Sequence, residues 1–328
     1  MVVAMGIGAV SIAPLEVVAI LVGQLGLDLG PDYSERQETV LTAIRVPRVL
    51  ATALVGAAWA GAGVAMQGLY RTPLADPALV GIGGGAALGA ALGAGAAVSA
   101  GVVASYAGTI AAVAGAFAGA LLAAFVVHRV ASSSGRVVVA TMLLAGIALT
   151  AFFGAVTAFA VTAARTPEIG SVQFWTLGSF AGIVGRDDVV DALLVIPAIA
   201  VLWRLGPRLD ALALGEAEAS HLGIDVPRLT AVVGVILALL TAAAVATAGV
   251  IAFVALMVPS LVRPFVGQGH RGVVIGSALL GATLVVVADV LARSLFSPAE
   301  LPIGVITTVV GAPFFLWLLL RDRGLLAR

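Results

Sequence analysis

Long apolar stretches alternate with short polar segments along almost the whole chain. A helix needs about 20 apolar residues to cross a bilayer core of about 30 Å, and most of these stretches reach or approach that length. Nine of them are predicted as membrane-spanning helices, at about 46–69, 78–97, 100–127, 137–163, 189–205, 229–247, 249–266, 273–294 and 302–320. The pattern predicts an all-α fold, a polytopic transmembrane helical bundle of about ten helices, formed by residues 1–328 as a single domain.

Three segments depart from this pattern. Residues 1–27 are apolar but are interrupted by a proline and a glutamate, so they form either one irregular span or the end of a span followed by an interfacial helix. Residues 164–191 are too polar to span and carry Phe174 and Trp175, which predicts a short interfacial or re-entrant helix. Residues 207–228 are predicted as the longest polar loop.

Arginine placement predicts the orientation in the membrane, because cytoplasmic loops carry an excess of basic residues. The richer side, predicted as cytoplasmic, holds Arg71, Arg129, Arg136, Arg204, Arg208, Arg228, Arg263, Arg271, Arg321, Arg323 and Arg328, and the poorer side holds Arg36, Arg45, Arg48, Arg165, Arg186 and Arg293. The C-terminus is therefore expected in the cytoplasm.

Composition limits the chemistry that this chain can perform. Apolar residues make up 61% of the chain and charged residues 10%, against about 25% charged residues in a soluble domain. There is no Cys, which excludes disulfides and thiolate metal sites, and all 17 basic residues are arginine, which removes the lysine of a P-loop ATPase. The formal net charge is zero, so no bulk field attracts nucleic acid. We expect no enzymatic activity and no metal site, and any ATP that drives the protein must be hydrolysed by another polypeptide.

Arg45 and Arg48 form an unusual pair at the outer end of a predicted span. They lie three residues apart on one helix face, and no acidic residue lies within six positions of either. They either anchor the helix at the interface or dock an acidic partner or an anionic substrate. Asp289 lies inside another predicted span, and Arg293 follows it by four residues, so we expect an ion pair there rather than a proton relay.

A second candidate interaction site lies in the polar segment at 207–228. The stretch from Ala213 to Gly223 predicts a short helix that ends at a glycine and is too short to span a membrane. It is either a connector or a surface helix that docks another subunit. In the second interpretation the docking residues are Leu214, Gly215, Glu216, Ala217, His221, Leu222 and Gly223.

Six motifs occur along the chain in the order of one known family. They read RVPR, GAAWAGAGVAMQGLYRTPLADPALVGIGGGAALG, LGEAEASHLGI, AGVIAFVALMVPSLVRPFVGQGHR, ADVLAR and LPIGVITTVVGAPFFLWLLLR. Together they resemble the permease subunits of bacterial ATP-binding cassette (ABC) importers for vitamin B12, ferric siderophores and haem. The resemblance runs from about Met5 to the C-terminus. Gly6 and residues 9–11 resemble the end of the family's first helix, so we expect that helix to be incomplete.

The resemblance implies a set of partners and their docking sites. It implies a homodimer in the bacterial inner membrane, with membrane lipid around it and the translocation path at its centre. It also implies two ATP-binding cassette ATPase subunits on the cytoplasmic face and a periplasmic substrate-binding protein opposite, with ATP bound by the partners and no cofactor bound by this chain. Arg45, Arg48 and Arg293 would pair with glutamates of the binding protein, and the helix at 214–222 would enter a cleft of the ATPase.

The expected function is therefore that of a permease that moves an iron chelate from periplasm to cytoplasm. Haem is favoured, ferric siderophore comes next and cobalamin is the third candidate. The preference for haem rests on an aromatic lining of the path by Phe152, Phe153 and Trp175. The alternative is an ion-coupled secondary transporter, which would need buried carboxylates along the path, and by sequence only Asp289 qualifies.

Overall fold

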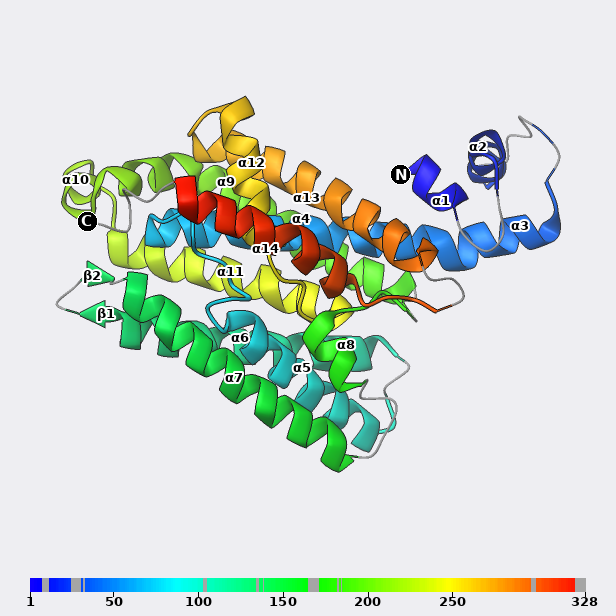
Figure 1. The fold of residues 1–328 in the computed structure, drawn as a ribbon, viewed down its shortest axis with the longest axis horizontal. Coiled ribbons are helices and arrows are strands. Elements are labelled where there is room, and N and C mark those ends of the chain that lie inside the picture. Colours follow the sequence, from blue (N-terminus) through cyan, green and yellow to red (C-terminus); the bar gives the residue numbers. More distant parts are fainter. Residues whose placement is uncertain are drawn as a thin grey trace.

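The structure is a computed structural model. It describes residues 1–7, 12–24, 31, 33–102, 105–133, 136–137, 139–164, 171–181, 183, 185–295 and 299–321. Within these ranges, long helices form one bundle with a two-stranded hairpin at one end (Figure 1). Seven of the described helices are long and apolar enough to cross a membrane, and three shorter apolar helices accompany them. The predicted all-α polytopic fold is confirmed.

The elements correspond closely to the predicted spans. In chain order they are α1 (Val2–Gly6), α2 (Pro14–Gly23), α3 (Glu35–Thr39), the π-helical turn η1 (Val40–Arg45), α4 (Val46–Tyr70), α5 (Ile82–Ser99), α6 (Tyr106–Ala131), β1 (Ser132–Ser133), β2 (Arg136–Val137), α7 (Val139–Ala164), α8 (Val172–Leu177), α9 (Gly185–Leu214), α10 (Glu216–His221), α11 (Val226–Ala248), α12 (Val254–Val266), α13 (His270–Ser294) and α14 (Ile303–Arg321). The nine predicted spans are α4, α5, α6, α7, α9, α11, α12, α13 and α14.

Helix α4 is the central helix of the bundle. Eighteen of its 25 residues are buried, including Trp59. It packs against α9, α11, α12 and α13 (Figure 1). A helix that is apolar on every face is either covered by other helices or in contact with lipid, and the many Ala and Gly residues of α4 let its neighbours approach closely. Helix α4 therefore fixes the positions of the residues at its two ends.

Backbone contacts through glycine hold two helix pairs together. A Cβ atom at Gly89 of α5 would collide with the carbonyl oxygen of Gly115 of α6, and the reverse is also true. Gly56 of α4 and Gly281 of α13 meet in the same way. Both helix pairs therefore approach closely through small residues.

The polar loop predicted at 207–228 is wrong in its first part. Helix α9 continues through Pro207 to Leu214. This extension carries a buried apolar face with helical spacing, formed by Leu205, Leu209 and Leu212. Packing of that face against the bundle holds the chain in a helix although proline removes one backbone hydrogen bond.

The two ends of the bundle carry different elements (Figure 1). The end that carries α1, α2 and α3 is called the outer end below, and the end that carries α10 and the β1–β2 hairpin is called the inner end. Helix α2 begins at Pro14 as a separate short helix, which agrees with the second of the two arrangements left open for residues 1–27. Helix α8 is short, as the sequence predicts. Residues 9–11 of the family-like segment, Arg165, Arg323 and Arg328 lie outside the described residues.

We predict that Gly89→Val lowers the free energy of unfolding by about 2–3 kcal/mol or more, because the new side chain must push α5 away from α6. Thermal melting of the purified protein in detergent measures the effect. Gly234→Ala on α11 is the matched control, since a Cβ at Gly234 meets no atom within 4 Å. Equal melting temperatures for the two variants would contradict the assigned backbone contact.

Candidate docking and coupling sites at the two ends of the bundle

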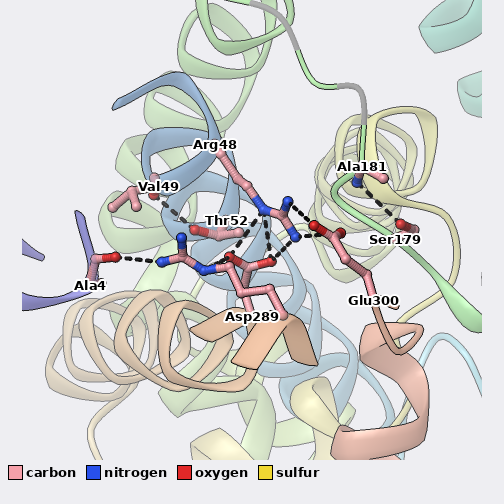
Figure 2. Close-up of polar contacts among 9 residues, drawn as sticks. Ala4, Arg48, Val49, Thr52, Ser179, Ala181, Asp289 and Glu300 are labelled. Atoms are coloured by element: carbon pink, nitrogen blue, oxygen red, sulfur yellow. Dashed lines mark hydrogen bonds and ion pairs between the residues drawn. The ribbon is translucent and has the colours of Figure 1, made fainter. Parts of the chain in front are cut away.

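Arg48 is the centre of a charged cluster at the outer end. It lies in the first turn of α4, and its Nη2 atom is 2.8 Å from Oδ1 of Asp289 on α13. Its Nε atom is 3.1 and 3.2 Å from the two oxygens of the same carboxylate. Glu300 is the second partner, with Nη1–Oε1 and Nη2–Oε2 distances of 2.9 and 3.0 Å (Figure 2). Arg48 therefore joins α4, α13 and the segment that precedes α14.

The two carboxylates of this cluster differ in their exposure to solvent. The Asp289 side chain is 3% exposed and the Glu300 side chain is 39% exposed. Hydrogen bonds donated by Arg48 lower the pKa of Glu300 from its ordinary value. Glu300 is thus a carboxylate at neutral pH, and the Arg48–Glu300 contact is an ion pair at the protein surface.

Arg45 and Arg293 hold the C-terminal end of α1. Arg45 Nη1 donates hydrogen bonds of 2.7 and 3.0 Å to the carbonyl oxygens of Met5 and Gly6, and Arg293 Nη2 donates to the carbonyl oxygen of Ala4. The last carbonyls of a helix have no partner within the helix and carry partial negative charge. Two guanidinium groups therefore cap α1, and Arg45 is only 5% exposed as a result.

The structure brings the three arginines with a predicted docking role, Arg45, Arg48 and Arg293, to one end of the bundle. The predicted pair of Asp289 with Arg293 is confirmed, at 3.6 Å from Nε to Oδ2. The sequence did not predict that Arg48 is the closer partner of Asp289, or that Glu300 also binds Arg48. In the sequence, Arg48 looks isolated because no acidic residue lies near it along the chain. Its partner Asp289 lies 241 positions away and comes close only in the folded protein. A requirement that every buried carboxylate have a cation would have suggested this contact.

Asp289 is not the only buried carboxylate among the described residues. Asp188 and Asp191 of α9 are also buried, and Thr109 Oγ1 of α6 donates a 2.9 Å hydrogen bond to Asp187. The expectation that Asp289 alone qualifies is therefore wrong. These aspartates lie in the first turns of α9, where the positive end of the helix dipole favours negative charge. The apolar pattern predicts that the span begins at 189, which leaves Asp187 and Asp188 in the preceding polar segment and Asp191 at the boundary between the two.

Helix α10 presents the predicted coupling residues at the inner end. Leu214 and Leu222 are 71% and 66% exposed, and Ala217 and His221 are also exposed. The helix predicted between Ala213 and Gly223 is present but begins later than expected, because Leu214 ends α9 and Gly215, with φ +134°, separates α9 from α10. Exposed apolar side chains thus come from two helices that meet at this glycine.

Gly223 ends the α10 segment as the sequence predicts. Its φ angle is +79°, and its N–H donates to the carbonyl oxygen of Ser220 at 2.9 Å. Positive φ is accessible to glycine without a steric penalty, so glycine suits the end of a helix. The chain then turns directly into α11.

The turn after α4 connects α10 to the centre of the bundle. Arg71 Nη2 is 3.2 Å from Glu216 Oε1 of α10. Five residues later, the buried Asp76 accepts hydrogen bonds from the N–H groups of Ala78, Leu79 and Leu256, the last in the first turn of α12. Burial raises the pKa of Asp76 to about 6, so the side chain is mainly a carboxylate at neutral pH. This turn therefore links α4, α10 and α12.

The three aromatic residues predicted to line a path differ in their exposure to solvent. Phe152 on α7 is exposed, whereas Phe153 is buried beside it, with ring centroids 5.7 Å apart. Trp175 is buried on α8 and packs edge-on against Phe174 at 4.8 Å. Of the three, only Phe152 presents its ring to the outside of this chain.

Comparison with known proteins gives consistent matches. The FecCD transport family matches residues 1–321. The haemin transport system permease protein HmuU of Yersinia pestis is 38% identical over 85% of this chain and 83% of its own length. The cobalamin import system permease protein BtuC of Halobacterium salinarum is 40% identical over 88% of this chain and 75% of its own length. A solved structure described as an inward-facing conformation of a putative metal-chelate type ABC transporter has a TM-score of 0.76 and 28% identity, covering 98% of this chain and 94% of that one.

We predict that Asp289→Asn lowers the free energy of unfolding by about 3–5 kcal/mol, because it leaves two partly buried guanidinium groups without their shared carboxylate. Chemical denaturation in detergent measures the loss. Asp225→Asn is the matched control, since Asp225 caps α11 through a hydrogen bond from the Arg228 N–H, which Asn also accepts. A loss as small as that of the control would show that the buried pair contributes little.

Proposed function

This chain belongs to the FecCD transport family, and from that premise we propose that it is the membrane-spanning permease subunit of an ABC importer for a metal chelate. One observation carries the proposal: a charged cluster around Arg48 and an exposed apolar surface at α10 lie at opposite ends of one helical bundle. An importer needs both, because it receives cargo on one side of the membrane and receives energy on the other. We propose that residues 1–328 act as one domain in a bacterial inner membrane, with the C-terminus in the cytoplasm.

The outer end is the proposed docking site of a periplasmic substrate-binding protein. Arg45, Arg48 and Arg293 gather there, and acidic side chains of a partner would complement them. In this proposal Arg45 and Arg293 act mainly by holding α1 in place, since both bind its carbonyl oxygens. Arg48 would make the charged contact, because its partner Glu300 is accessible to solvent.

The inner end is the proposed coupling site for two separate ATPase subunits. A six-residue helix such as α10 is marginal in water by itself, so a partner that covers it would also stabilise it. The docking surface comprises Leu214, Gly215, Glu216, Ala217, His221, Leu222 and Gly223. A push on α10 would reach α4 and α12 through the Arg71–Glu216 ion pair and the Asp76 turn.

A second copy of this chain completes the proposed translocation path. Helices α7 and α14 carry large exposed apolar side chains on their outer surfaces, including Phe152, Phe159 and Leu316. A partner copy would cover part of this surface and lipid the rest. Rocking of the two copies between outward-open and inward-open states would then carry cargo between them.

The proposed cargo is a metal macrocycle, with haem first and cobalamin next. The two relatives named above carry haemin and cobalamin in their names. In both molecules a macrocycle holds a metal ion. Ferric siderophore is a third candidate. The aromatic argument for haem now depends on Phe152 alone, since Phe153 and Trp175 are buried.

We predict that proteoliposomes containing this permease, its ATPase and its binding protein take up haem only when ATP is supplied. Competition with unlabelled cobalamin and ferric siderophore ranks the three cargoes. Uptake should persist after a protonophore collapses the proton gradient. Uptake that follows the gradient and ignores ATP would instead support an ion-coupled secondary transporter, for which the buried Asp188 and Asp191 would be the first residues to test.

We predict that Ala217→Arg lowers co-purification of the ATPase by about tenfold or more, because it puts a charge at the centre of a contact that excludes water. The permease itself should remain folded, since Ala217 is exposed. Quantitative pull-down with tagged permease measures the effect.

Ala100→Arg is the control for this experiment, because it makes the same change at an exposed position at the end of α5. Unchanged co-purification for Ala217→Arg would mean that α10 is only a connector.

A further inference from the structure

We propose that Glu300 occupies the place of the acidic docking partner on Arg48, so that docking is an exchange of one carboxylate for another. Glu300 would then set the specificity of docking, because only a partner that binds Arg48 better than Glu300 does can replace it. The inference rests on the proposed docking of a binding protein at the outer end. It adds a residue to that site that none of the sequence motifs above assigns.

The hydrogen-bond capacity of Arg48 is the first argument. A guanidinium group has five N–H donors, one on Nε and two on each Nη. Asp289 takes the Nε donor and one Nη2 donor, and Glu300 takes the other Nη2 donor and one Nη1 donor. Within the described residues, a single Nη1 donor remains. An incoming carboxylate needs two parallel donors to bind in the strong bidentate geometry, so one of the present carboxylates must leave.

The unequal burial of the two carboxylates decides which one leaves. Asp289 is 3% exposed and also lies 3.6 Å from Arg293, so its departure would leave charges uncompensated inside the bundle. Glu300 is 39% exposed, so water can solvate its carboxylate when it leaves, whereas Arg48, at 14% exposed, remains paired with Asp289. Figure 2 shows Glu300 and Asp289 on two adjacent edges of the Arg48 guanidinium group, both bound to its Nη2 atom. Glu300 is therefore the exchangeable partner.

The exchange needs only a side-chain rotation. The backbone next to Glu300 is fixed by two hydrogen bonds, from the Leu301 N–H to the carbonyl oxygen of Ala292 and from the Ile303 N–H to the carbonyl oxygen of Gly178, both 3.1 Å. Rotation of the Glu300 side chain into water would free two N–H donors on Arg48 without breaking these backbone hydrogen bonds. Asp289 would keep the guanidinium group in place throughout.

This arrangement discriminates between partners by their charge. A partner that offers a neutral amide or hydroxyl group cannot replace a carboxylate, because its hydrogen bonds to a guanidinium group are weaker. A partner that offers a carboxylate held in a favourable position can. Glu300 thus suppresses docking of weakly acidic proteins and reduces the affinity of the correct one by a modest factor.

The test measures docking affinity for Glu300→Gln. The permease is placed in lipid nanodiscs, and binding of the substrate-binding protein encoded with it is measured by biolayer interferometry. The amide of Gln holds Arg48 less strongly than a carboxylate does, so the variant should bind about two- to fivefold more tightly than the parent. Glu300→Ala should change the affinity in the same direction, and melting temperatures confirm that both variants are folded.

Glu35→Gln is the matched control, because it removes an exposed acidic group from α3 at the same end of the bundle. Its affinity should equal that of the parent. Equal or weaker binding by Glu300→Gln would overturn the exchange, and weaker binding would mean that Glu300 itself contacts a cation of the partner.

The double variant Arg45→Glu with Arg48→Glu separates this inference from the proposed function. Loss of binding in the double variant, together with tighter binding by Glu300→Gln, supports both docking and exchange. Loss of binding without tighter binding by Glu300→Gln overturns only the exchange. Unchanged binding in the double variant would overturn docking at this end, and the exchange with it.

Discussion

The buried carboxylate of Asp289 determines the arrangement of the outer end. A charge inside an apolar bundle is stable only with a partner of opposite sign and with hydrogen bonds to its oxygens. Arg48 supplies both from α4, and Arg293 adds a second cation from the same helix as Asp289. The start of α4 and the last turns of α13 are thereby joined. The segment before α14 is then attached to the same guanidinium group through Glu300.

At the inner end, α10 is joined to the turn after α4 by one ion pair at the protein surface. Arg71 and Glu216 are both partly exposed, so their ion pair is weaker than the buried pair at the other end. A weak contact suits a surface that must respond to a partner, because little free energy is needed to rearrange it. Asp76 supplies a firmer connection just behind it, through backbone hydrogen bonds that tie the turn to α12. Helix α10 is therefore weakly attached, whereas the turn behind it is firmly attached to α12.

Apolar periodicity was sufficient to predict the bundle, because a membrane span has a simple requirement for length and polarity. It located α4, α11 and α13 to within a few residues. It failed at α9, where charged residues and Pro207 hid an apolar face of Leu205, Leu209 and Leu212 that becomes clear only once packing is known.

For the candidate sites, the sequence predicted several of the residues but few of the contacts between them. The likeness to known permeases and the placement of arginines pointed to Arg48 and α10, but not to their contacts. Glu300 lies 252 residues from Arg48 in the chain, and no local pattern joins such distant residues. The same limit applies to the path, since spacing along the chain gave no sign that Phe153 and Trp175 face inward.

The glycine contact between α5 and α6 has a mechanical consequence. Where two backbones touch at Gly89 and Gly115, no side chain lies between them that could change rotamer and let one helix slide past the other. Helices α5 and α6 are therefore expected to move as one rigid body. Any change of shape during a working cycle must then take place at boundaries between helices where side chains, rather than two backbones, are in contact. A label on α5 should keep its distance to a label on α6 in every state of the protein.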